Sequence, residues 1–133
     1  MLIDSRDFSR QAYKSLAELK KKTIQGSDLG KASSLVQSLP AYISTWGLHR
    51  LCGDNIKYAG ESRSKETRYK SQVYERFLSD LKAESQVRFE PNDPETLFDK
   101  DIRAYAGLNR LAIQMAREWS FWAVPVLGKA EEG

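Results

Sequence analysis

Cysteine and histidine are almost absent from this chain of 133 residues, which has only Cys52 and His49. A single cysteine excludes an internal disulfide framework, and we therefore expect a reducing, cytoplasmic location. A zinc site takes about four ligands, and no second Cys or His can complete one around this pair. A cysteine nucleophile would also need an orienting carboxylate and an oxyanion-binding loop, which the neighbouring residues do not supply. The sequence therefore predicts no metal, no cofactor and no enzymatic activity.

Long apolar runs are missing too. No stretch approaches the roughly 18 consecutive apolar residues of a membrane-spanning helix. Residues 1–7 carry charges where a signal peptide would need an apolar run. Gly26 and Gly30 do not form a phosphate-binding loop, because the Gly-Lys pair at 30–31 is followed by Ala32 instead of Ser or Thr. We therefore expect neither a membrane partner nor a nucleotide-binding loop.

What the sequence does contain is helical periodicity almost throughout. Apolar residues recur every three or four positions, which is the spacing of one face of an α-helix. Helices are expected over about residues 5–22, 29–46, 48–59, 69–81 and 101–124, with a short further helix around Leu97 and Phe98. The sequence therefore predicts an all-α fold, a compact single-domain bundle of five to six helices over residues 1–133.

The apolar faces identify the expected core. The first two long helices contribute Phe8, Ala12, Leu16, Leu19, Leu29, Ala32, Val36, Leu39, Ile43 and Trp46. The last two contribute Tyr69, Val73, Phe77, Leu78, Leu81, Tyr105, Leu108, Leu111, Ala112, Met115, Trp119 and Trp122. We expect the helix that carries Trp119 and Trp122 at the centre of the bundle.

Glycine and proline indicate where helices end. Gly47 can take the left-handed conformation that ends the second helix, and Pro40 lies inside that helix. Pro125 and Gly128 are expected to end the last helix. Residues 60–67 include no apolar residue, and we expect a mobile loop there.

Charge is divided unevenly along the chain. The net charge of +3 combines 15 Lys and Arg against 9 Asp and Glu in residues 1–82 with 6 against 9 in residues 83–133. The first part is therefore +6 and the second −3. Such a division suits a protein that contacts a polyanion on one side and a protein on the other, or one that packs against a copy of itself. A solvated surface explains it equally well.

Three basic clusters are candidates for a nucleic-acid-binding surface. Two are rows on helix faces opposite the expected core: Arg6, Arg10, Lys14 and Lys21 in the first helix, and Arg103, Arg110 and Arg117 in the last. The third is Arg63, Lys65 and Arg68, in and beside the predicted loop. Phe121 falls beside the arginines of the last helix, where an aromatic ring is expected to contact a protein groove or a stacked base.

Two apolar patterns resemble a known family. Residues 35–48 read L-x-x-x-L-P-x-x-I-x-x-x-G-L, and the last helix carries Tyr105, Leu108, Leu111 and Trp119 in a Y…L-x-x-L…W arrangement. Both patterns resemble the small subunit of the type III-B (Cmr) CRISPR effector complex. The matching positions are mostly apolar, so the basic clusters above rest on the residues of this chain alone.

The resemblance implies a non-catalytic α-helical subunit that stacks head to tail as a minor filament in the complex. Its implied protein partners are the backbone subunits, the large polymerase-like subunit and copies of itself. Its implied nucleic-acid partners are guide RNA, target RNA or single-stranded DNA, contacted through basic faces without base readout.

Two other classes of function stay open. The chain could be a helical adaptor that binds only protein, through Phe121 and the acidic segment 84–101, which holds six Asp and Glu against two Lys and Arg. An unrecognised enzyme is the third class. Salt-dependent affinity for nucleic acid separates the first class from the adaptor.

Overall fold

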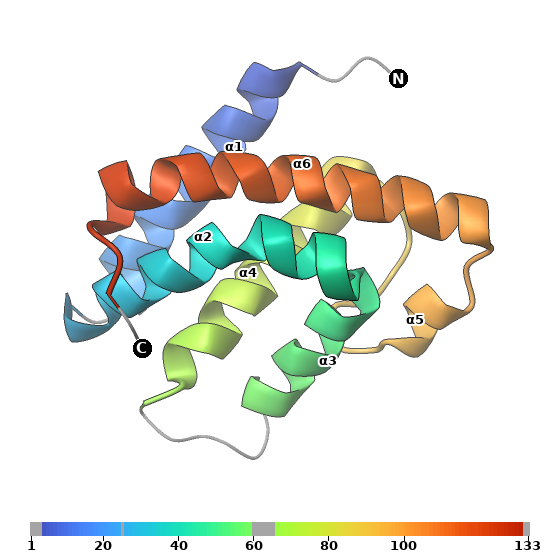
Figure 1. Cartoon of the computed structure of the whole chain (residues 1–133), viewed down its shortest axis with the longest axis horizontal. Helices are drawn as coiled ribbons and strands as arrows, with labels where there is room; N and C mark the ends of the chain where they lie inside the picture. The colour runs from blue at the N-terminus through green and yellow to red at the C-terminus, as the bar shows by residue number, and fades with distance from the viewer. Residues whose placement is uncertain (1–3, 25, 60–65, 132–133) are drawn as a thin grey trace.

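The computed structural model describes residues 4–24, 26–59 and 66–131, with helices and no β-strand in these ranges (Figure 1). The α-helices are α1 (Ser5–Glu18), α2 (Leu29–Trp46), α3 (Leu48–Ala59), α4 (Arg68–Ser85), α5 (Glu95–Phe98) and α6 (Ile102–Leu127). The predicted all-α fold of five to six helices is confirmed. Of the predicted loop at 60–67, only Glu66 and Thr67 lie within the described residues, in a turn.

The long helix α6 is the axis of the molecule. Figure 1 shows it running across the full width, with α2 alongside it and α1 crossing behind it. Both α1 and α2 pack on α6, whereas α3 packs mainly on α4. The short helix α5 lies at the end of the molecule where α6 begins. The 26 residues of α6 span about 39 Å, at roughly 1.5 Å of rise per residue. Side chains at its two ends therefore lie far apart.

The buried side chains form one core cluster, drawn from all six helices. Most of the predicted core is buried, whereas Leu29, Tyr105, Leu111 and Trp122 are half-buried against it. The prediction is wrong for Trp46, which is 51% exposed. Trp46 is the last residue of α2, and the guanidinium of Arg50 lies 4.8 Å from its ring centre. A cation–π contact on the outside replaces core packing at this position.

The two long apolar helices end at glycines. Gly47 and Gly128 both have positive φ angles, 89° and 107°, which glycine adopts without a Cβ clash. Pro125 does not end α6, contrary to expectation, because the helix continues through it to Leu127. A proline in the last turn removes only one backbone donor, so the helix can extend a few residues further before Gly128 caps it.

The first helix continues as a π-helical turn over Leu19–Thr23. Leu19 stays buried, and the Ile24 amide donates to the Leu19 carbonyl at 2.7 Å. Lys21 is exposed, as expected for a member of the row with Arg6, Arg10 and Lys14. The turn also exposes Lys20 and Lys22, and the three lysines form one group, here named the lysine end.

Trp119 lies where α6, α1 and α4 meet. Its side chain is fully buried, with its ring edge-to-face on Phe77 of α4 at 5.2 Å between ring centres. Its indole N–H donates to Oε1 of Gln11 in α1 at 3.1 Å. The Gln11 amide in turn donates to the Asp80 carboxylate of α4, which also accepts from Arg76. One buried ring and one polar network thus join three helices.

We expect Trp119→Ala to lower the free energy of unfolding by about 3–5 kcal/mol, since it leaves a large cavity and removes the donor to the half-buried side-chain oxygen of Gln11. Trp46→Ala is the matched control, because this tryptophan is exposed, and its effect should stay below about 1 kcal/mol. Denaturant unfolding monitored by circular dichroism measures both. Equal effects of the two substitutions would contradict the placement of Trp119.

Burial raises the pKa of Asp80 above its ordinary value of 3.8, although hydrogen bonds from Ser15 and Gln11 and the charge of Arg76 oppose the shift. The folded state therefore holds this proton more tightly than the unfolded chain does. The contribution of Asp80 to stability is full below pH 3.8 and is lost as the pH rises through its folded pKa.

Carboxyl NMR titration measures this pKa directly. Asp80 should titrate at higher pH than Asp4, whose pKa is lowered by hydrogen bonds from Arg6. The reverse order would show that the hydrogen bonds lower the pKa of Asp80 by more than its burial raises it.

Candidate nucleic-acid interface

The arginines of α6 form a row on its outer face, as predicted. Arg103, Arg110 and Arg117 are all exposed, and none forms an ion pair within the described part of the chain. Successive members are seven residues apart, which corresponds to about 10.5 Å along the helix axis. This arginine row therefore presents three unneutralised charges over about 21 Å of rigid helix.

The basic row of α1 is partly neutralised by acids of the same helix. Arg6 pairs with Asp4 at 2.8 Å, and Arg10 pairs with Asp7 at 3.0 Å. Lys14 is exposed without an ion pair to any described residue. The sequence spacing already permits the Arg10–Asp7 pair, because residues three apart are neighbours on a helix. Of the two rows, the arginine row of α6 is thus the freer to bind an anion.

The third predicted cluster is only partly described. Arg63 and Lys65 lie outside the described residues. Arg68 is the first residue of α4 and is exposed. With Lys31 of α2 it lines an open pocket that also contains Asp28 and Glu66. Charges of both signs meet there, so this pocket makes no distinct anion site.

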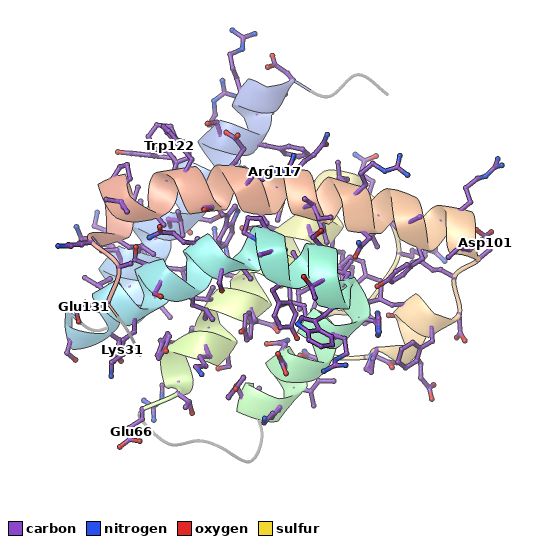
Figure 2. All side chains as sticks on the ribbon, viewed as in Figure 1. Lys31, Glu66, Asp101, Arg117, Trp122 and Glu131 are labelled. Atoms are coloured by element: carbon purple, nitrogen blue, oxygen red, sulfur yellow. The ribbon has the colours of Figure 1, made fainter. Side chains whose placement is uncertain are left out.

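Phe121 is 65% exposed and belongs to a larger group of rings. Its ring stands edge-to-face on Trp122 at 5.0 Å between centres, and Tyr13 of α1 stands edge-to-face on the same indole at 5.4 Å. The Trp122 N–H donates to Oγ of Ser9 at 2.7 Å, which ties the indole to α1. Tyr13, Trp122 and Phe121 together form an aromatic strip across the junction of α1 and α6. Figure 2 shows Trp122 and Arg117 on neighbouring turns of α6.

A second exposed apolar area lies at the opposite end of α6. Phe98 is 62% exposed and Ile102 is 82% exposed, and both line a hollow with His49 and Tyr105. His49 Nδ1 lies 2.7 Å from the Tyr105 hydroxyl, so the two side chains are hydrogen-bonded. Exposed acids surround the area. We name Glu95, Phe98, Asp99, Asp101 and Ile102 the acidic end.

The structure presents no catalytic arrangement around Cys52. The thiol is buried and lies 3.0 Å from the Pro91 carbonyl oxygen, whereas His49 bonds Tyr105. Burial raises the pKa of Cys52 to about 11, so the thiol is protonated and unreactive near neutral pH. In the ranges that the structure describes, no three His, Cys, Asp or Glu side chains are grouped to hold a metal ion.

None of the helices described is both long and apolar enough to cross a lipid bilayer. Comparison with models of protein families, with curated proteins and with solved structures finds no match to this chain.

Sequence reasoning missed two parts of this surface. It placed Trp122 in the core and did not single out Tyr13, because the contact between them joins helices more than 100 residues apart in the chain. A helical wheel does place Tyr13 within about 60° of both Arg6 and Arg10, which was an available signal. It also left Ile102 unassigned, although this residue begins α6 beside the acidic cap Asp101.

Replacing Arg110 and Arg117 together with Glu should weaken binding to single-stranded RNA of any sequence, because two unpaired cations are lost. For single strands each phosphate contact contributes about 0.7 to the slope of log affinity against log salt, so the slope should flatten by roughly 1.4. Fluorescence anisotropy with a labelled RNA over a range of salt concentrations measures it.

The matched control reverses Arg6 and Arg10, which have acidic partners on their own helix and should matter less. Both double variants should keep the helix content of the parent protein. If the Arg6 and Arg10 variant lost more affinity for RNA than the Arg110 and Arg117 variant, the main phosphate contact would lie on α1 and not on α6.

Proposed function

We propose that this protein is a non-catalytic structural small subunit of a type III CRISPR ribonucleoprotein effector complex. It stacks as a minor filament and contacts guide–target nucleic acid without reading its sequence. The resemblance of residues 35–48 and of the last helix to the Cmr small subunit suggests the complex. The arginine row of α6 is the observation that carries the nucleic-acid contact.

The arginine row suits a polyanion for three reasons. Its guanidinium groups are permanently charged, they form no ion pair with the other described residues, and they project from one straight element. The spacing of about 10.5 Å between successive arginines lets each guanidinium contact a different phosphate of one strand. Contacts of this kind neutralise phosphates and carry no sequence information.

Head-to-tail stacking is supported by the two ends of the molecule. The acidic end lies where α6 begins, and the lysine end lies at the opposite side of the molecule (Figure 1). A contact between the acidic end of one copy and the lysine end of the next joins two different surfaces. Heterologous contacts of this type generate open filaments when the rotation between copies does not close a ring. Phe98 and Ile102 supply the apolar surface that such a contact buries.

The adaptor alternative binds only protein, through Phe121 and the acidic segment 84–101. It predicts no binding to nucleic acid, so charge reversal in the arginine row has no such binding to weaken. The two functions therefore differ in one observable, the effect of the arginine row on binding to nucleic acid.

Co-expression with the backbone subunits and guide RNA of a type III-B complex tests the proposal. The chain should co-purify in several copies, and Ile102→Asp should reduce the number of copies because it places a charge in the stacking contact. Ile56→Asp is the matched control, because this isoleucine of α3 is also exposed but belongs neither to the stacking ends nor to the arginine row. A complex that assembles fully without the chain at low salt would contradict the proposal.

A further inference from the structure

We propose that the aromatic strip of Tyr13, Trp122 and Phe121 is a binding site for unpaired nucleobases of a single-stranded RNA or DNA. The inference shares one premise with the proposed function, namely that the cations near the strip attract a nucleic acid. It adds a contact of a different kind, because stacking involves the bases and the arginine row involves phosphates.

The rings are exposed and held in place. Tyr13 is 53% exposed and Phe121 is 65% exposed, and each makes an edge-to-face contact with the indole between them. The hydrogen bond from Trp122 to Ser9 satisfies the polar atom of the indole and fixes the ring against α1. A prearranged group of rings loses little conformational freedom when a ligand binds. The strip is therefore a ready surface for flat apolar ligands.

Cations flank the strip on both helices. On α1, Arg6 and Arg10 lie within about 60° of Tyr13, and Lys14 follows it directly in sequence. On α6, Arg117 lies one turn before Phe121, about 40° away on the helix wheel. Two bound flat bases would thus bring their phosphates near positive charge on either side.

Acids are also present near the strip. Asp4 and Asp7 pair with Arg6 and Arg10, and Glu118 is half-buried one turn before Trp122. The two ion pairs are exposed, and exposed pairs contribute little stability, so a phosphate can compete for these arginines. Arg117 forms no ion pair with a described side chain, and Lys14 forms none either, although it lines a hollow with Glu18 and Glu84. Arg117 is therefore the cation beside the strip that is freest to contact a phosphate.

The acidic end provides an internal comparison. It exposes Phe98 and Ile102 to a similar degree, but the acids Glu95, Asp99 and Asp101 outnumber the cations Lys100 and Arg103 around it, and this excess of acids disfavours phosphates. One exposed apolar area thus suits a protein partner and the other a polyanion with aromatic groups.

Single strands, and not duplexes, fit the strip. Bases within a duplex are stacked on each other and their faces are inaccessible, whereas unpaired bases stack readily on aromatic side chains. Every base has such a face, so the site should tolerate any sequence. Truncating one stacking ring typically weakens single-strand binding about 5-fold to 150-fold.

The test compares two single-stranded probes with equal backbone charge, a 12-nucleotide oligothymidine and an abasic oligonucleotide of the same length. Tyr13→Ala and Phe121→Ala should each weaken binding of oligothymidine by about tenfold and leave abasic binding unchanged. The salt slope should not change, because no phosphate contact is lost. Phe98→Ala is the matched control, an equally exposed phenylalanine at the acidic end, and should have no effect.

Tryptophan fluorescence gives a second readout. Trp119 is buried, so Trp46→Phe leaves Trp122 as the one solvent-accessible tryptophan in the protein. Oligothymidine should quench this fluorescence, and the abasic probe at equal occupancy should not.

The outcomes separate this inference from the proposed function. If Phe121→Ala weakens both probes equally, or if neither probe quenches Trp122, the stacking site is wrong and the phosphate contact stands. If neither probe binds in a salt-dependent way, both proposals fail. If the strip variants change only self-association of the protein, the strip is a contact between copies and the inference is overturned.

Discussion

The packing of Trp119 is the constraint on which the rest of the structure depends. Its ring fills the junction of α6 with α4, and its N–H reaches Gln11 of α1, which in turn bonds Asp80 of α4. These contacts fix the rotation of α6 about its own axis. Because that rotation buries Trp119, it must turn Arg110 and Arg117 outward and bring Trp122 against α1. The candidate interface is therefore a direct consequence of how the core is filled.

Periodicity predicted the elements well because each long helix buries one continuous stripe. The bounds of α2 and the burial of Val36, Leu39 and Ile43 follow from spacing alone. The errors come from effects that spacing does not encode. Pro125 fails to end α6 because a proline in the final turn removes only one donor, and Trp46 stays exposed because it is the last residue of α2 and its ring contacts Arg50. Neither effect changes the hydrophobic pattern.

The candidate site was predictable in its charges and in Phe121, and not in the other two rings, Tyr13 and Trp122. Arginines seven residues apart must share a helix face, whatever the helix packs against. The contact of Tyr13 with Trp122 depends instead on how α1 crosses α6, and no local pattern sets that crossing. The Arg10–Asp7 pair lies between these cases, since its spacing was visible in the sequence but its formation depends on side-chain geometry.

The central claim is sequence-independent contact with nucleic acid through fixed positive charge. Its most direct measurement is the affinity of the unmodified protein for two unrelated single-stranded RNAs of equal length, over a range of salt concentrations. We predict equal affinities and a linear fall of log affinity with log salt, steep enough for several phosphate contacts. Affinity that does not depend on salt, or a strong preference for one of the two sequences, would contradict the claim.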